Sequence, residues 1–359
     1  QGKRFYPVSS YAPHGRSKMR RNYISILVAM LVCALLLSGC LLKIKEIEND
    51  VVLPQIDPEE GVTRQVQGGL YYSLIDREGV IKINSTIYIK SYETVENAVL
   101  RALSQTPQEH SDLVLSALPK GTEAISSQRE GSILYLTLSK EFLDKAELES
   151  RRQEIEEEKD RLRPGEYESI LNALDKEYFK AMRLSVYSIV NSMLSVTDVD
   201  RIQLLVDKNG TGEGVRPTLY EVGLSEDIES GELVEPMPLV TNQTATPATI
   251  VELLLDHLIL KDYERAYDYF ALVGTNNEYK PDLTEFVDEL SPLCKITEYD
   301  MQGYVQNSNG EAMVRFRLVI ERENGTPEII YNDGLILLEE GGIYLVDYIT
   351  FLDVLRQSL

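Results

Sequence analysis

The sequence contains few of the side chains that build metal sites and nucleophilic sites. Tryptophan is absent, and histidine and cysteine occur only three times each in 359 residues. No group of histidines and cysteines has the spacing of a metal site. Serine nucleophile motifs and glycine-rich phosphate loops are missing, and no pair of the many carboxylates stands out from a solvated surface. We therefore expect no metal, no cofactor and no catalytic residue, and a protein that is not an enzyme.

Basic residues are scarce beside acidic ones. The chain has 36 Lys and Arg against 58 Asp and Glu, a formal charge of -22. Residues 1–39 hold six of the basic residues and no acidic one, so the remainder is still more acidic. Such a surface repels nucleic acid and anionic lipid head groups. We expect no nucleic-acid partner, and any attachment to a membrane must use something other than a basic patch.

A long hydrophobic run occurs near the beginning. Residues 24–42 are 19 uncharged residues that follow Arg20 and Arg21, and Ser38 and Gly39 precede Cys40. A basic region, an apolar region and small residues at a cleavage site are typical of a secretory signal. The alternative is an uncleaved anchor, since about 20 residues cross a bilayer. Both interpretations place the acidic remainder outside, and we expect Met19 as the start, with residues 1–18 as a leader.

The stretch Leu37-Ser38-Gly39-Cys40 resembles the lipobox of bacterial lipoproteins. The resemblance implies cleavage before Cys40, a diacylglycerol on its sulfur, and palmitate among the attached chains. The protein would then be anchored by lipid on the outer face of the bacterial cytoplasmic membrane. Cys33 would leave with the signal, so no intramolecular disulfide could form. We expect the remaining Cys294 to be a buried small apolar residue.

Composition divides the chain after residue 39 into four parts. A polar spacer covers residues 40–67, a first domain 68–212, a linker 213–247 and a second domain 248–359. The linker contains Pro217, Pro236, Pro238 and Pro247. Within the first domain, residues 144–176 are highly charged and are interpreted as a helical insertion. We expect the helix at 144–163 to be solvated, because apolar residues recur there only once per heptad; the alternative is a face that binds a partner.

The first domain alternates strand-like and helix-like patterns. Apolar residues at every second position predict strands at 70–75, 80–90, 123–128, 132–138 and 201–206. Apolar stripes at helical spacing predict helices at 94–104 and 168–194. A further strand is predicted at 218–222, inside the linker. The pattern indicates an α+β fold with helices on one face of a sheet.

The second domain begins with helices and ends with strands. Helices are predicted from residue 247, at 263–270 and at 281–290. Strands are predicted at 295–305, 312–321, 328–338 and 343–351, separated by turns rich in Asn and Gly. Four consecutive hairpin-linked strands indicate a curved antiparallel sheet. The fold class of the whole chain is therefore predicted to be α+β.

Residues 70–210 resemble a GerM domain, a family named for a sporulation and germination lipoprotein. The resemblance is carried by Leu118-Pro119-Lys120-Gly121-Thr122, by Leu138-Ser139-Lys140-Glu141-Phe142 and by Ile189-Val190. It implies a non-enzymatic extracytoplasmic module that serves sporulation, germination or envelope remodelling. Residues 248–359 resemble the nuclear transport factor 2-like cone through 262–270. That fold hosts both enzymes and binding modules, so it says little about activity.

Three hypotheses about function follow. The first is a scaffold that binds another envelope protein, the second a ligand binder or enzyme with a pocket in the C-terminal domain. The third is an adaptor for a peptidoglycan hydrolase, close to peptidoglycan. A cone filled by Leu, Ile and Phe favours the first, and a deep cavity with convergent polar side chains favours the second. His110 is predicted to be solvated in a loop, and His257 to be packed beside an apolar helix stripe.

Overall fold

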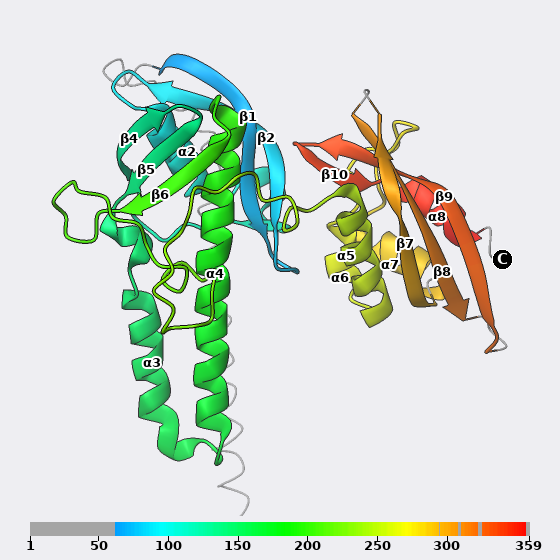
Figure 1. The fold of residues 1–359 in the computed structure, drawn as a ribbon. Helices are drawn as coiled ribbons and strands as arrows, with labels where there is room; N and C mark the ends of the chain where they lie inside the picture. Colours follow the sequence, from blue (N-terminus) through cyan, green and yellow to red (C-terminus); the bar gives the residue numbers. More distant parts are fainter. Residues whose placement is uncertain (1–61, 294, 308–309, 322–324, 357–359) are drawn as a thin grey trace, which may run out of the picture. The chain divides into compact units, whose positions relative to one another are not determined.

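The computed structural model describes residues 62–293, 295–307, 310–321 and 325–356. These residues belong to one compact unit that spans Glu60–Leu359. Cys40, the predicted signal and most of the predicted spacer lie outside the described residues, and so does Cys294. Helices and sheets are both present, including a curved antiparallel sheet (Figure 1), so the α+β fold class is confirmed.

The first sheet contains a long β-hairpin. Strand β1 (Val62–Leu74) pairs with β2 (Val80–Lys90), and the short β3 (Val114–Leu115) pairs with the other edge of β1. The strand β1 begins at Val62, whereas the sequence pattern predicted a start at Leu70. Residues 62–67, predicted as spacer, are therefore part of a strand, because they find backbone partners along the end of β2.

A second sheet contains the other strands of the N-terminal half. Strands β4 (Ala124–Glu130), β5 (Ile133–Leu138) and β6 (Arg201–Val206) lie in the order β4-β5-β6. The first pair is antiparallel and the second is parallel. A parallel pair needs a long crossover connection, and the helices between β5 and β6 provide it. The six strands thus form two three-stranded sheets, where the sequence predicted one.

Two helices pack against both sheets. Helix α2 (Val95–Leu103) is capped by Thr94, and α4 (Glu166–Val196) packs along β1. The hydroxyl of Ser192 accepts a hydrogen bond of 2.8 Å from the backbone N–H of Tyr71. The predicted apolar stripe of α4 is confirmed by five buried residues, Met182, Val186, Ile189, Val190 and Met193. Apolar burial on this face therefore holds α4 against the sheet.

Helix α3 (Ala146–Glu158) and the first half of α4 form an antiparallel helical arm. Figure 1 shows this arm extending away from the strands. Leu148 is the one buried residue of α3, and Arg152 pairs with Asp175 of α4 at 2.5 Å. The prediction of a solvated helix in this charged segment is confirmed.

The segment predicted as a linker packs against the N-terminal half. Val222 and Val234 are fully buried, and Met237 exchanges backbone hydrogen bonds with Ile202 of β6. The strand predicted at 218–222 is wrong, because these residues form turns and one isolated bridge from Thr218 to Leu233. Residues 213–247 thus add to the core instead of crossing open solvent.

The C-terminal half has helices followed by a four-stranded sheet. The helices are α5 (Pro247–Leu260), α6 (Tyr263–Tyr267) and α7 (Leu283–Leu293). The strands are β7 (Ile296–Gln306), β8 (Glu311–Glu321), β9 (Pro327–Glu340) and β10 (Ile343–Val346). The order β10-β9-β8-β7, antiparallel throughout, confirms the predicted hairpins.

The last predicted strand is wrong beyond Val346. A helix, α8 (Tyr348–Arg356), follows β10 directly. Its buried residues Tyr348, Phe351, Leu352 and Leu355 recur at helical spacing. The backbone N–H of Phe351 donates to the carbonyl of Asp347, which starts the helix. The spacing of the buried apolar residues therefore changes from every second residue in β10 to helical spacing in α8.

Aromatic rings fill the interior of the C-terminal half. Phe270 makes edge contacts with Phe286 at 5.4 Å and with Phe351 at 5.5 Å between ring centroids. Tyr348 contacts Phe270 in the same way at 5.5 Å. Phe270, Phe286, Phe316 and Phe351 are at most 1% exposed. The described part of residues 247–356 is called the cone, and these rings occupy the space that a ligand cavity in its interior would need.

Candidate functional site: a polar cleft beside β2

The turn between β1 and β2 contacts the helices of the C-terminal half. Within this turn, Asp76 accepts hydrogen bonds of 2.7 Å from Arg265 and from the hydroxyl of Tyr269. The Nε2 atom of His257 lies 3.1 Å from the same carboxylate. One carboxylate therefore joins residues of α5, of α6 and of the segment that follows α6 to the hairpin.

The contacts of Asp76 and of the next two residues, Arg77 and Glu78, together form what we call the ionic joint. Arg77 pairs with Glu252 and lies 3.9 Å from Asp256, both on α5. Glu78 pairs with Arg183 of α4 at 2.6 Å. Three consecutive charged side chains thus hold the hairpin against helices from both halves. The sequence pattern places residues 76–79 only between two predicted strands, since nothing local reveals partners that lie so far along the chain.

The electrostatics of the joint depend on Asp76. Burial alone would raise the pKa of this carboxyl group, but hydrogen bonds from Tyr269, Arg265 and His257 outweigh it, so its pKa lies below its ordinary value. Burial, together with the hydrogen bond to Asp76, raises the pKa of the Tyr269 hydroxyl. Asp76 therefore stays ionised and Tyr269 stays a donor near neutral pH.

A second contact involves the turn between β9 and β10. A Cβ atom on Gly342 would lie 2.6 Å from the backbone nitrogen of Asn84, and one on Gly341 would lie 2.3 Å from His110 Nε2. Both glycines have positive φ, 57° and 90° in chain order, which L side chains rarely adopt. Glu339 accepts a hydrogen bond of 2.9 Å from the side-chain amide of Asn84. The glycines are therefore needed for this close approach.

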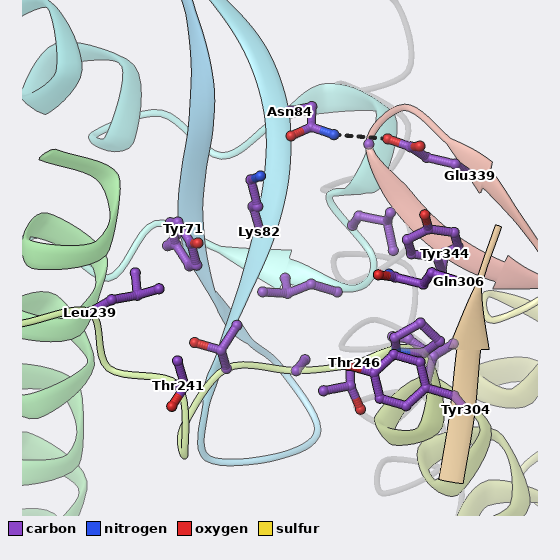
Figure 2. Close-up of a pocket in the computed structure, with 17 residues that line it drawn as sticks. Tyr71, Lys82, Asn84, Leu239, Thr241, Thr246, Tyr304, Gln306, Glu339 and Tyr344 are labelled. Carbon is purple, nitrogen blue, oxygen red and sulfur yellow. Dashed lines mark hydrogen bonds between the residues drawn. The ribbon is translucent and has the colours of Figure 1, made fainter. Parts of the chain in front are cut away.

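A cleft of about 430 Å³ lies beside this second contact. Figure 2 shows residues of β1 and β2 on one side, the end of the 213–247 segment below, and strands of the cone opposite. Tyr304, Gln306 and Tyr344 gather on the cone side, while Lys82 projects from β2. The volume of the cleft falls within the range of about 300–1,000 Å³ that is typical of small-molecule sites.

Some polar groups of the cleft are already used by the protein. The hydroxyl of Thr246 caps α5, and the hydroxyl of Thr244 bonds to Val240 and to Asn191. In the part of the chain that the structure describes, the side-chain polar groups of Tyr304, Gln306 and Tyr344 bond to no protein atom. These three residues, which come from two edge strands of the cone, are therefore available to a ligand.

The charges in the cleft balance. Among the described residues that line it, Lys82 and Glu339 are the only ones that carry a formal charge. Burial raises the pKa of Tyr344, and the nearby Glu339 adds to this effect, so the hydroxyl is a neutral donor. No His, Cys or Ser of the described ranges lines the cleft. Within residues 62–356, as far as they are described, no group of three His, Cys, Asp or Glu side chains is placed to hold a metal ion. This arrangement is suited to binding by hydrogen bonds and ring contacts.

His110 and His257 are both packed in the structure, whereas the sequence predicted this only for His257. The prediction of a solvated His110 is wrong, because the residue is 6% exposed and lies under Gly341. The prediction of a packed His257 is confirmed, since its ring stacks on Tyr269 with centroids 5.7 Å apart. Cys40, the predicted lipidation site, lies outside the described residues, as does Cys294.

The cleft itself was not found from the sequence. Lys82 and Asn84 alternate with buried isoleucines on β2, which marks them as outward-facing residues. The same is true of Tyr304 and Gln306, which are exposed near the end of β7. No pattern within either strand shows that the two exposed faces meet, so no local signal could have found the cleft.

Comparisons with known proteins identify no family. No family model matches the chain, and no curated protein matches it. One similar solved structure, described as a lipoprotein from Clostridium perfringens, is 17% identical, with 45% of this chain and 80% of that chain covered and a TM-score of 0.20. Another, described as a calcium/calmodulin-dependent protein kinase II association domain from Xanthomonas campestris, is 11% identical, with 28% and 79% covered and a TM-score of 0.23. Similarities this weak identify neither a family nor a function. The resemblance of residues 70–210 to a GerM domain therefore stays a prediction.

Among the described residues, no helix is both long enough and apolar enough to cross a bilayer. The apolar run at 24–42 lies outside those residues.

Proposed function

We propose that this protein is a lipid-anchored extracytoplasmic lipoprotein that acts as a non-enzymatic scaffold or interaction module. Its place would be the outer face of a bacterial cytoplasmic membrane, and its process sporulation, germination or envelope remodelling. The stretch Leu37-Ser38-Gly39-Cys40 supports the anchor and the location. The resemblance of residues 70–210 to a GerM domain supports the process.

The filled interior of the cone is the observation that carries the scaffold proposal. An enzyme or ligand binder that used the interior of the cone would need a concave site there, and in that place Phe270 packs against Phe286 and Phe351. The ionic joint at Asp76 and Arg77 adds support, because it holds the two halves as one body. A body of this kind offers fixed surfaces, including the exposed helical arm of α3 and α4, on which an envelope protein could pack.

The lipid anchor is tested by metabolic labelling with a palmitate analogue. We expect the wild-type chain to be labelled and to sediment with membranes, and Cys40→Ala to lose the label and to leave the membrane fraction. Cys33→Ala is the matched control, since it lies in the same apolar run and should change neither result. Equal labelling of Cys40→Ala and wild type would contradict the anchor.

The scaffold role is tested by crosslinking in sporulating cells. A C-terminally tagged chain is crosslinked, captured and compared with tagged Cys40→Ala expressed at the same level. We expect a defined envelope protein to be enriched with wild type and reduced with Cys40→Ala, because only the anchored chain meets its partner. If both chains capture the same background proteins, the role as an envelope scaffold fails, whatever the labelling experiment shows.

A second candidate function is ligand binding, either alone or as an adaptor for a peptidoglycan hydrolase. The observation that favours it is the polar cleft, part of whose wall comes from the C-terminal half. In the cleft, three polar side chains converge without a protein partner among the described residues. This candidate is compatible with a scaffold that also holds a ligand.

A further inference from the structure

We infer that the cleft beside β2 binds an oligosaccharide of N-acetylated amino sugars, the class of glycan found in bacterial cell walls. This inference adds a ligand to the proposed scaffold, and it uses that proposal only to bring the cleft outside the cytoplasmic membrane. Four features of the cleft support it: its rings, its amides, its charge balance and its blocked strand edge.

The first feature is a pair of tyrosine rings at the cleft. Tyr304 is 41% exposed on β7, and Tyr344 is half-buried on β10. Figure 2 shows both side chains on the same side of the cleft. The face of an aromatic ring carries negative charge density, so it attracts the weakly positive C–H groups of a pyranose ring. Tyrosine adds a hydroxyl that exchanges hydrogen bonds with sugar hydroxyls.

The second feature is a pair of side-chain amides. Asn84 donates its N–H to Glu339, so its carbonyl oxygen remains an acceptor, and this oxygen points away from Glu339 in Figure 2. Gln306 has both its donor and its acceptor unused within the described structure. An N-acetyl group offers one N–H donor and one carbonyl acceptor, so it matches these two amides. Plain glucose polymers lack that group.

The third feature is the balance of charge. Lys82 and Glu339 leave the lining formally neutral, in a chain whose total charge is -22. A phosphate or nucleotide needs a surplus of positive charge, which this cleft and this protein do not supply. A neutral sugar meets no such barrier, and Lys82 can additionally pair with the carboxylate of an acidic amino sugar.

The fourth feature excludes the main rival, an extended peptide added to the edge of β2. The strand β2 lies at the edge of its sheet, but Val80 already exchanges backbone hydrogen bonds with Gln243 and Ala245. At the other end of the cleft, Gly342 closes against the backbone of Asn84. A peptide strand needs several consecutive free backbone groups, and too few remain between these two contacts. Side chains are therefore left as the binding groups.

The test is calorimetric titration of the full chain, purified in detergent, with chitotetraose. We expect saturable binding, and weaker binding of cellotetraose, which has no N-acetyl groups. Tyr304→Ala and Gln306→Ala should each weaken binding of chitotetraose about tenfold or more, as expected for residues at the centre of a site. Both residues are exposed, so the variants should fold, and their unfolding curves check this.

Two matched controls define the site. Tyr331 is 66% exposed on the same sheet but outside the cleft, and Gln302 is exposed on the same strand as Gln306. Tyr331→Ala and Gln302→Ala should leave the affinity within about twofold of wild type. Equal losses in the control and cleft variants, or equal affinities in all of them, would overturn the inference.

The remaining outcomes are also decisive. Absence of heat with chitotetraose at millimolar concentration would overturn the inference. Protection of β2 amides from hydrogen exchange by a synthetic wall peptide, but not by chitotetraose, would assign the cleft to a peptide and overturn it equally. Binding does not depend on the lipid, so failure of the Cys40 labelling experiment would leave this result unchanged. Failure of glycan binding would in turn leave the anchored scaffold intact.

Discussion

The carboxylate of Asp76 accepts a hydrogen bond of 2.7 Å from the hydroxyl of Tyr269, although 193 positions separate the two residues in the chain. Arg265 and His257 approach the same carboxylate at 2.7 and 3.1 Å. The side chain of Asp76 is only 17% exposed. One charged turn residue therefore joins the N-terminal hairpin to the cone.

Asp76→Asn should lower the free energy of unfolding at pH 7 by about 1–2 kcal/mol, because a hydrogen-bonded, partly screened charge is removed. The pKa of Asp76 is lowered from 3.8 in the folded protein. Its stabilisation is therefore present above pH 3.8 and is lost as the pH falls through the folded pKa. Urea unfolding at pH 7 and at a pH below the folded pKa measures the difference.

Asp160→Asn is the control for this variant, since Asp160 is exposed in the connection between α3 and α4. It should change stability at pH 7 by less than about 0.5 kcal/mol. The difference between Asp76→Asn and wild type should shrink at the acidic pH. A difference that stays constant with pH would show that the carboxylate charge is not what stabilises the joint.

Gly342→Ala should separate the β9–β10 turn from β2. Its Cβ would lie 2.6 Å from the backbone nitrogen of Asn84, and φ at this position is 90°. The backbone strain alone costs about 1–2 kcal/mol, and the steric clash adds to it. We expect faster hydrogen exchange at residues 82–85 and a lower melting temperature.

Gly165→Ala separates strain from clash. Gly165 has φ of 84°, and a Cβ there would meet no atom within 4 Å. It should lower the melting temperature less than Gly342→Ala does, and exchange at residues 82–85 should stay at the wild-type rate. Equal effects of the two variants on both measurements would mean that the close approach to Asn84 contributes nothing.

Phe270→Ala should strongly destabilise the cone. Phe270 is 1% exposed and contacts the rings of Phe286, Tyr348 and Phe351. Removing a buried phenylalanine ring leaves a cavity and costs about 3–5 kcal/mol. Chemical unfolding measures the loss, with Tyr331→Ala as an exposed aromatic control that should cost less than about 0.5 kcal/mol. A loss below about 1 kcal/mol for Phe270→Ala would indicate that the cone interior is loosely packed.

Local patterns predicted most elements of the fold. The alternation of Ile81, Ile83, Ile87 and Ile89 predicted β2 with its correct bounds, because a strand buried on one face requires period two. Thr246 and Pro247 predicted the start of α5, where the structure has a capping box. The errors at 218–222 and 347–351 are of another kind. There, tertiary contacts decided between two structures that the local residues allow.

The function-bearing features divide in the same way. The sequence by itself determined the acidic charge, the apolar run before Cys40, the α+β class and the order of the hairpins, because each depends on composition or on the spacing of neighbouring residues. Only the tertiary structure decided that Gly341 would cover His110, that Asp76 would bond to Tyr269, and that Lys82 would share a cleft with Tyr304. Each of these pairs is brought together by the packing of distant segments, and no local periodicity carries information about which exposed faces will meet.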